Sequence, residues 1–332
     1  MTQTLVVIAA SRGGLSVLKT LVSDLDRDFQ ATILVVMHVG RHPSILPELL
    51  AAWGAVAVSH AIDGETMKIG RIYVAPPDRH MVVHGDKIQL LDTAAENFCR
   101  PAADPLFRSA AVHYGDRVIG VVLTGDLDDG AAGLAAIAAR GGYRIVQQPE
   151  DCEAPSMPRS ALAAAGADVV TTQEKLPSVL RAAISELFQR GGAMISSRPD
   201  LDREAQIAEN GLAYPEDLDE IAERSALTCP SCNGVLWRLR DERPLRYRCH
   251  TGHAYSVLSL EEATARATTD AIWRAIRAVR EHMILAQERC FSAQRLGNYG
   301  DAALERARVE ENEKLVALLR EVAGAHALVE HS

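Results

Sequence analysis

The first 190 residues alternate short apolar runs with longer segments in which apolar side chains recur every three or four positions. The short runs are rich in valine, isoleucine and leucine, which is typical of strands buried on both faces of a sheet. They predict six strands, over residues 5–9, 33–37, 71–74, 118–123, 144–146 and 168–171. The longer segments predict six helices, over residues 14–25, 44–53, 105–114, 130–139, 158–165 and 176–188.

Strands and helices that alternate in this way predict a doubly wound α/β domain over residues 1–190, with a mostly parallel sheet between two layers of helices. One stretch differs from this pattern. In residues 81–90, a Gly85-Asp86 turn separates two β-type runs, which is typical of an antiparallel hairpin. We therefore expect a mixed sheet that includes this hairpin.

The remainder of the chain divides into three parts. Residues 191–225 are rich in glycine, serine and acidic side chains and predict a linker. Residues 226–257 contain a cluster of cysteine and histidine residues and predict a small zinc-ribbon-like module. From 258 to 329, Ala, Leu, Glu and Arg dominate, with a break near residues 296–300. This last part predicts an α-helical hairpin, because helices joined by a short loop normally pack antiparallel.

Composition excludes several classes of protein. Hydrophobic residues make up 48% and charged residues 24% of the chain, which rules out wholesale disorder. The net charge of −9 argues against a protein that coats nucleic acid. No apolar run approaches the roughly 20 residues of a membrane helix, and the first residues lack the basic segment of a signal peptide. We expect a cytoplasmic protein without membrane insertion.

Polar side chains with complementary chemistry directly follow three of the predicted strands. Ser11 follows the first strand and His38 the second, and the carboxylates Asp126, Asp128 and Asp129 follow the strand at 118–123. In open α/β sheets, ligands bind beyond the carboxyl ends of the strands. A hydroxyl, an imidazole and a carboxylate at one sheet edge are the parts of a nucleophile, a general base and an orienting acid.

Each of these residues also has a simpler interpretation. Ser11 and Asp129 precede predicted helices, where serine and aspartate are favoured as N-caps. His38 fits equally well as a hydrogen-bonded histidine of the core. Gly13-Gly14 after Ser11 also suggests nucleotide binding, but this pair lacks the Gly-x-Gly-x-x-Gly fingerprint. The three complementary residues at three strand ends favour the catalytic interpretation.

Residues 1–190 resemble the catalytic domain of the chemotaxis receptor-glutamate methylesterases, the CheB family, in a form without a receiver domain. The resemblance lies in the order and spacing of six short segments: Val7-Ile8-Ala9-Ala10-Ser11-Arg12-Gly13-Gly14, Val36-Met37-His38, Val74-Ala75-Pro76-Pro77-Asp78-Arg79-His80, Arg100-Pro101 with Asp104-Pro105-Leu106-Phe107, Leu123-Thr124-Gly125 with Asp129-Gly130-Ala131, and Met157-Pro158.

The resemblance implies a serine hydrolase that demethylates glutamyl methyl esters of methyl-accepting chemotaxis receptors and also deamidates glutamines. It implies Ser11 as nucleophile, His38 as general base and Asp129 as orienting acid. The oxyanion hole then falls on the backbone N–H of Asp126, with that of Arg12 beside it. This chemistry requires no metal or organic cofactor. The partners it implies are the cytoplasmic helices of chemoreceptors.

The loop of the orienting acid departs from the family pattern, which reads roughly Thr-Gly-Met-Gly-x-Asp-Gly. Asp126 brings a carboxylate to the oxyanion position, and Leu127 replaces a glycine. Ala9 and Pro77 also replace glycines. These departures leave an alternative hypothesis, in which the chain is a catalytically weak or inactive regulatory binding module of a chemosensory signalling complex.

The cysteine and histidine cluster has the spacing of a metal site. Cys229-Pro-Ser-Cys232 is followed, after sixteen residues, by Cys249-His250-Thr251-Gly252-His253. Two such knuckles predict a structural zinc ion held by Cys229, Cys232, Cys249 and a histidine. A similar ending in some receiver-less relatives favours His253 over His250. The alternative is a degenerate ribbon that has lost its metal.

Two further features of the C-terminal part bear on partners. Five arginines accompany Trp237 and Tyr247 in the ribbon, a composition shared with nucleic-acid modules; they are Arg238, Arg240, Arg243, Arg246 and Arg248. The acidic chain favours instead a solvated ribbon surface. Apolar residues of the helical hairpin, among them Trp273 and Ile284, predict a surface for docking a protein of the signalling complex or for dimerisation.

Overall fold

The computed structural model describes residues 3–39, 42–190, 197–240 and 243–329, with only the backbone described for residues 190 and 325–329. The chain divides into two compact units, Met1–Leu260 and Glu261–Ser332. The predicted α/β domain and the predicted ribbon both fall within the first unit.

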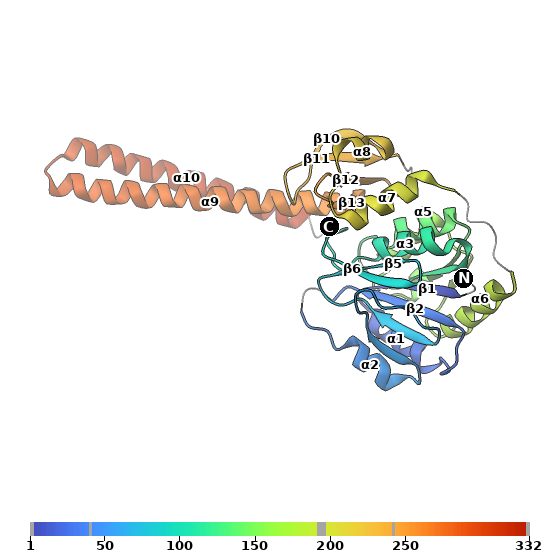
Figure 1. Ribbon diagram of the computed structural model, residues 1–332. Coiled ribbons are helices and arrows are strands. Elements are labelled where there is room, and N and C mark those ends of the chain that lie inside the picture. The colour runs from blue at the N-terminus through green and yellow to red at the C-terminus, as the bar shows by residue number, and fades with distance from the viewer. Residues whose placement is uncertain (1–2, 40–41, 191–196, 241–242, 330–332) are drawn as a thin grey trace. The chain divides into compact units, whose positions relative to one another are not determined.

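A seven-stranded sheet forms the centre of the first unit, in the order β3-β4-β2-β1-β7-β8-β9 (Figure 1). Every strand pair in it is parallel. The strands are β1 (Thr4–Ala10), β2 (Ala31–Met37), β3 (Ala57–His60), β4 (Arg71–Val74), β7 (Val118–Val122), β8 (Tyr143–Gln147) and β9 (Val169–Thr171). The sequence pattern did not predict β3, because this edge strand is half exposed and therefore has no apolar run.

Helices cover both faces of the sheet, as a doubly wound fold requires. One face is packed by α1 (Gly14–Ser23), α2 (Leu46–Trp53) and α6 (Leu176–Arg190). The other face is packed by α3 (Ala103–Tyr114), α4 (Ala131–Ala139) and α5 (Ser156–Ala165). Successive residues of β1 pack into the hydrophobic cores on opposite faces of the sheet, with Val7 on the α3 side and Ile8 on the α1 side. All seven residues of β1 are buried, which explains its continuous apolar run.

The predicted hairpin forms, but it lies outside the main sheet. Strands β5 (His80–His84) and β6 (Lys87–Leu91) pair antiparallel as a separate two-stranded sheet. The main sheet is therefore purely parallel and not mixed. Met81 and Val83 of β5 pack into the α3-side core, so the hairpin serves as a further covering element of that face.

Two helices occupy most of the region predicted as a linker. They are α7 (Pro199–Asn210) and α8 (Pro215–Ile221), and each begins at a proline, a residue favoured in the first turn of a helix. Leu201 and Ile207 of α7 are buried. Residues 191–196 of the predicted linker lie outside the described residues. Short 3-10 turns also lie at Gly115–Arg117 and Pro149–Asp151.

A four-stranded antiparallel sheet follows, in the region predicted as a ribbon. Its strands are β10 (Ala222–Thr228), β11 (Val235–Leu239), β12 (Arg246–Cys249) and β13 (Ala254–Ser256), paired in chain order. The sequence predicted a solvated surface for the arginines of this sheet. Arg246 and Arg248 differ from that expectation, because both are buried in ion pairs with Glu204 and Glu96.

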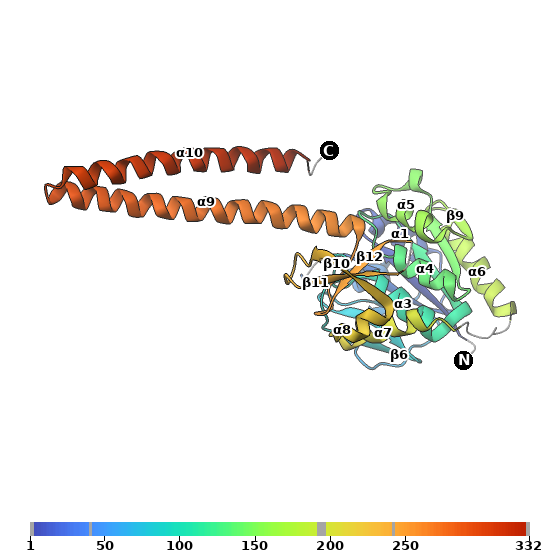
Figure 2. The same cartoon turned by 90° about the horizontal axis from the view of Figure 1, so that it is seen from above.

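The second unit consists of a long helix, α9 (Val257–Arg295), without its residues 257–260, which belong to the first unit, and of a second long helix, α10 (Tyr299–Val329). The two helices run side by side in both views (Figures 1 and 2). The break between them falls at residues 296–298, where the sequence predicted it. Gly297 adopts a left-handed φ of +75° there, and Asn298 accepts the N–H of Asp301 in the first turn of α10. Among the described residues, no helix has both the length and the apolar character needed to cross a bilayer.

Candidate active site

The ends of β1, β2 and β7 are tied together by backbone hydrogen bonds. Ala10 lies opposite Met37 in the parallel register, and the N–H of His38 donates to the carbonyl oxygen of Ala10 at 3.1 Å. The N–H of Ser11 donates to the carbonyl oxygen of Thr124 at 3.0 Å. Strand order reverses between β1 and β7, so these residues lie where open α/β sheets bind their ligands.

Close approach of the Thr124-Gly125 loop to Ser11 explains why residue 125 is glycine. A Cβ atom at Gly125 would lie 2.7 Å from the Cβ of Ser11 and 2.1 Å from the sulfur of Met157. Both distances are too short for any side chain. The loop that carries the three aspartates is therefore packed directly against the predicted nucleophile.

The structure joins the predicted base to the predicted acid. Nε2 of His38 lies 2.7 Å from Oδ2 of Asp129, and the Asp129 side chain is only 3% exposed. The partner of the His38 ring is therefore a carboxylate from the loop after β7. A carboxylate that accepts the Nε2 proton fixes the tautomer of the ring, which leaves Nδ1 as the nitrogen able to accept a proton.

Asp129 is held by donors from the first turn of α3 and from Asn97. Its Oδ2 also accepts the N–H of Ala103 at 2.6 Å, and its Oδ1 accepts the N–H of Asp104 at 3.2 Å and Nδ2 of Asn97 at 3.3 Å. The two backbone donors belong to α3, whose N-terminal N–H groups have no partner within the helix. Asp129 therefore serves the N-terminus of α3 and not that of α4, where Gly130 holds the N-cap position.

These contacts shift the pKa values of the pair in opposite directions. Burial alone would lower the pKa of His38, but hydrogen bonds to Asp129 and to the thiol of Cys99 raise it to about 10. Burial alone would raise the pKa of Asp129, but the hydrogen bond and charge of His38, with the N–H groups of α3, hold it below its usual value. The neighbouring carboxylate of Asp104 has its pKa raised to about 8, by burial and by the charge of Asp129.

The three carboxylates of one loop have three different environments. Asp129 binds His38. The side chain of Asp128 is buried, which raises its pKa to about 6, and it accepts the hydroxyl of Ser256 at 2.7 Å. The carboxylate of Asp126 forms an exposed ion pair with Arg12 at 3.0 Å. The negative charge of Asp126 is thus paired with the exposed guanidinium group of Arg12. This pairing reduces the repulsion that an unpaired carboxylate would exert on an oxyanion at the predicted position.

Ser11 lies at the correct strand end, beside the His38–Asp129 pair. Among the described residues, its hydroxyl makes no hydrogen bond to the His38 ring, so its role as nucleophile stays a prediction. Catalytic hydrogen bonds are often long in the absence of substrate. Ser11 is not the cap of α1, because Gly13, with φ of +79°, occupies that position.

The backbone around the predicted oxyanion hole is strained at one residue. Leu127, which replaces a family glycine, adopts a left-handed φ of +60°. This conformation costs a non-glycine residue roughly 1–2 kcal/mol, and such strain is typical of functional loops. Within the described part of the chain, the backbone N–H groups of Asp126 and Arg12 donate to no protein acceptor, so both are available to a ligand.

Three residues at the site were missed by the sequence analysis. Cys99 contacts the His38 side chain, Asn97 contacts Asp129, and Ser256 contacts Asp128. Residues 97 and 99 lie in an irregular loop, and Ser256 lies more than 100 positions from its partner. Periodicity gives no signal for either case. The adjacent Arg100-Pro101 and Asp104-Pro105 segments, which carry the family resemblance, were the one local indication that this loop approaches the site.

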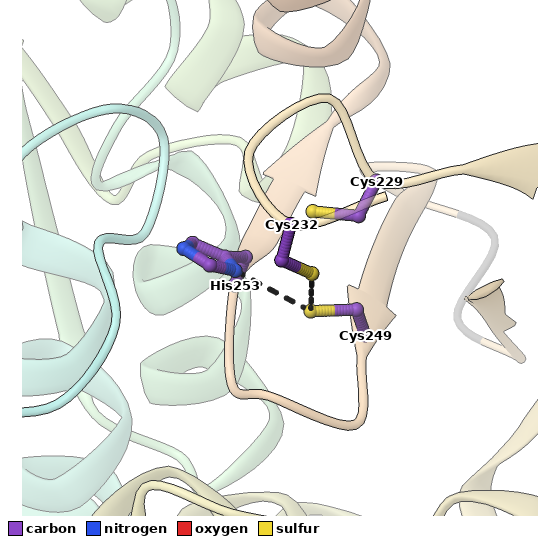
Figure 3. A group of neighbouring side chains, drawn as sticks. All are labelled: Cys229, Cys232, Cys249 and His253. Carbon is purple, nitrogen blue, oxygen red and sulfur yellow. Dashed lines mark hydrogen bonds between the residues drawn. The ribbon is translucent and has the colours of Figure 1, made fainter. Parts of the chain in front are cut away.

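The predicted metal ligands form a second cluster, in the four-stranded antiparallel sheet and its turns. Ligand atoms of Cys229, Cys232, Cys249 and His253 all lie within 4.8 Å of one another (Figure 3). The sulfur atoms of Cys232 and Cys249 are 3.7 Å apart, and Nδ1 of His253 lies 3.5 Å from the sulfur of Cys249. His250 is outside the cluster, with its ring against Trp237 at a centroid distance of 6.4 Å.

Comparisons with known proteins agree with this architecture. A provisionally named protein-glutamate methylesterase/protein-glutamine glutaminase of Leptospira interrogans is 37% identical over 187 residues, which cover 56% of this chain and 93% of that protein. The protein-glutamate methylesterase/protein-glutamine glutaminase 2 of Koribacter versatilis is 33% identical over 181 residues, which cover 53% of this chain and 50% of that protein.

A solved structure and a family model match the same region. The crystal structure of the Thermotoga maritima CheB methylesterase catalytic domain aligns with a TM-score of 0.53 and 32% identity, covering 55% of this chain and 99% of that one. The CheB methylesterase model matches residues 6–180, more than half of the chain. The fold, the strand-end residues and these matches lead to one conclusion: the chain belongs to the CheB methylesterase family.

Proposed function

We propose that the chain is a serine hydrolase that demethylates glutamyl methyl esters of chemoreceptors and deamidates receptor glutamines. The observation that carries this proposal is the 2.7 Å contact between His38 and Asp129, at the sheet edge where Ser11 ends the neighbouring strand. A base oriented by a buried carboxylate beside a strand-end hydroxyl is the arrangement that nucleophilic catalysis needs.

The first half of the proposed reaction forms an acyl-enzyme. Nδ1 of His38 takes the proton of the Ser11 hydroxyl while Oγ bonds to the ester carbonyl carbon. The carbonyl oxygen becomes an oxyanion, which the backbone N–H groups of Asp126 and Arg12 stabilise. When the tetrahedral intermediate collapses, the bond to the methoxy group breaks. His38 returns its proton to that oxygen, and methanol leaves.

The second half releases glutamate. A water molecule gives its proton to His38 and attacks the acyl carbon, and Ser11 leaves with the proton that His38 returns. For a glutamine substrate the leaving group is ammonia and the other steps are the same. Asp129 stays ionised throughout and stabilises the imidazolium form of His38.

Two observations favour turnover over the alternative of an inactive binding module. The carboxylate of Asp126 is paired with Arg12, which removes the electrostatic objection to an acidic residue at this position. The left-handed backbone that a family glycine would provide is retained at Leu127. The proposed substrates are receptor helices of the cytoplasm, so the proposal includes a cytoplasmic location.

The test uses the 332-residue chain and a methylated receptor fragment. We expect methanol release, and we expect a serine-directed phosphonate to label one residue, which peptide mass spectrometry identifies as Ser11. Labelling should be lost in Ser11→Ala and retained in Ser16→Ala, a serine of α1 whose hydroxyl donates to the carbonyl oxygen of Gly13. A label on another residue, or no methanol, would overturn the proposal.

The contact between Cys99 and His38 predicts an effect on the pH profile. Only neutral His38 acts as a base, and Cys99 contributes to the raised pKa of His38. Cys99→Ala should therefore lower this pKa, move the acidic limb of kcat/KM to lower pH, and increase the rate at neutral pH. Cys152→Ala, a change in a thiol that bonds the carbonyl of Gln148, is the control. An acidic limb that stays in place, or moves to higher pH, would contradict this prediction.

For the ribbon, we propose a structural zinc ion held by Cys229, Cys232, Cys249 and His253. Three sulfur donors and one imidazole suit zinc, which structural sites bind with four such ligands. The position of His253 among the cysteines supports its choice over His250. Such an ion would link β12 and β13 to the turn after β10, and it has no role in the proposed hydrolysis.

Metal analysis of purified variants tests this site. We expect one zinc per wild-type chain, loss of zinc in Cys249→Ser and His253→Ala, and normal content in Cys152→Ser and His250→Ala. Loss of the metal should also lower the melting temperature, because metal binding to the folded state stabilises it. Stoichiometric zinc in the Cys249→Ser protein would count against the proposed site.

We further propose that the helical hairpin binds a helical protein of the signalling complex. Ile276, Ala286 and Val316 are buried, whereas Trp273, Ile284, Phe291 and Leu318 remain exposed. Exposed apolar side chains on a long helix pair are typical of a docking face. Light scattering on the purified chain should give the molar mass of a monomer, as expected if this face is free to bind another protein. A dimer that Trp273→Ser dissociates would assign the face to a second copy of the chain.

A further inference from the structure

A segment of the C-terminal ribbon pairs with the irregular loop that approaches the active site. The N–H of Asn97 donates to the carbonyl oxygen of Ala254 at 2.9 Å, and Glu96 forms a parallel β-bridge with Ala254. Asn97 itself adopts a left-handed φ of +48°. The loop therefore takes part of its backbone pairing from a strand that lies more than 150 residues later in the sequence.

The side chain of Asn97 connects this segment to the catalytic carboxylate. Its Nδ2 donates to Asp104 at 2.9 Å and to Asp129 at 3.3 Å. Its Oδ1 accepts the N–H of Ser256 at 3.0 Å and the hydroxyl of Ser259 at 2.9 Å. Asn97 is 5% exposed and Ser259 is fully buried, so water does not compete for these bonds.

The two donors from the C-terminal segment determine which way the Asn97 amide faces. An amide oxygen accepts and an amide nitrogen donates, so the end that receives Ser256 and Ser259 must be the oxygen. The nitrogen is then directed at the two carboxylates. Without those donors, only the bonds to Asp104 and Asp129 would hold the amide, and its buried oxygen would lack a partner.

A buried ion cluster holds the ribbon against the same loop. Arg248 contacts Glu96 at 2.6 Å, and Glu96 also accepts Arg108 of α3 at 2.9 Å. Arg246 contacts Glu204 of α7 at 2.6 Å, and Glu204 contacts Arg108 at 3.1 Å. Removing one partner from such a cluster leaves an uncompensated buried charge. The attachment of the ribbon is therefore a fixed part of the first unit.

We propose that Asn97 is a positioning residue for Asp129, and that the segment Ala254–Ser259 completes the active site by fixing Asn97. This inference rests on the proposed hydrolase function. It gives β13 and the start of α9 a role in positioning Asp129, while Ser11 and His38 remain the residues proposed to act on the substrate.

A double-mutant cycle measures this connection. Asn97→Ala removes a donor to a buried carboxylate and should lower kcat about 10- to 100-fold with little change in KM. Ser259→Ala removes one of two donors to Asn97 and should lower kcat by about 3- to 10-fold. In the Asn97→Ala background, Ser259→Ala should have no further effect, because Ser259 acts through Asn97. Full additivity of the two changes would overturn the proposal.

A second measurement does not depend on turnover. The proton shared by His38 and Asp129 should give a far-downfield NMR resonance in the free enzyme, and this resonance should shift or broaden in both variants. Ser178→Ala, an exposed serine that bonds the carbonyl oxygen of Lys175, should leave it unchanged. An unaltered resonance in folded Asn97→Ala protein would overturn the proposal. Retained methanol release in Ser11→Ala would instead refute the proposed function, so the two failures are distinguishable.

Discussion

Replacement of Ser11 by alanine is expected to lower kcat for methanol release by about 10⁴-fold or more, while the affinity for methylated receptor changes little. The alanine side chain cannot form the acyl-enzyme, so the two-step route through a covalent intermediate is lost. Removal of a triad nucleophile leaves only the oxyanion hole and substrate positioning, which explains why a small residual rate survives.

The Ser11→Ala experiment needs evidence that the loops around Ser11 are intact. The N–H of residue 11 still donates to the carbonyl oxygen of Thr124, and the Cβ that packs against Gly125 is kept. We therefore expect an unchanged melting temperature. Methanol release at the wild-type rate by folded Ser11→Ala protein would show that another group is the nucleophile.

The sequence predicted the strand-end residues because their signals are local. Ser11 and His38 each follow an apolar run directly, and a parallel sheet brings the carboxyl ends of its strands to one edge. The same argument could not choose among Asp126, Asp128 and Asp129, which lie within four positions of one another. The choice depends on which carboxylate meets the N-terminus of α3, and that contact depends on tertiary packing.

The contacts that could not be predicted from sequence join distant parts of the chain. Nothing near Asn97 indicates that Ser256 and Ser259 bind it, since about 160 residues separate them. The predicted linker likewise contained Glu204, which the structure buries between Arg108 and Arg246. The composition of this region predicted a linker, whereas the partner arginines, supplied by other elements, make burial of Glu204 favourable.

Asp129→Asn is expected to lower kcat about 10⁴-fold without removing the side chain, a loss known for the same change in other serine hydrolase triads. Four donors converge on the two oxygens of Asp129, from His38, Ala103, Asp104 and Asn97. An asparagine has only one oxygen. In either orientation of the asparagine amide, its NH₂ group replaces one of the two oxygens of Asp129. At least one N–H donor that bonded to that oxygen then loses its acceptor and faces another donor.

The orientation of the amide determines the damage to catalysis. If the NH₂ group faces His38, it donates to Nε2 and forces the proton onto Nδ1, which can then no longer accept the proton of Ser11. If the NH₂ group faces Asn97 instead, it opposes the Nδ2 of that residue and the N–H of Asp104. The loss of negative charge also lowers the pKa of His38, so the acidic limb of the residual kcat profile should move to lower pH.

A kcat profile over pH, measured alongside the melting temperature, tests both effects in the Asp129→Asn protein. Asp28→Asn, at an exposed position, is the matched control and should behave as wild type. Because Ser11 and Asp129 act as one unit, the double variant should be scarcely slower than Ser11→Ala alone. A folded Asp129→Asn protein within about tenfold of the wild-type kcat would mean that His38 does not depend on this carboxylate for its orientation.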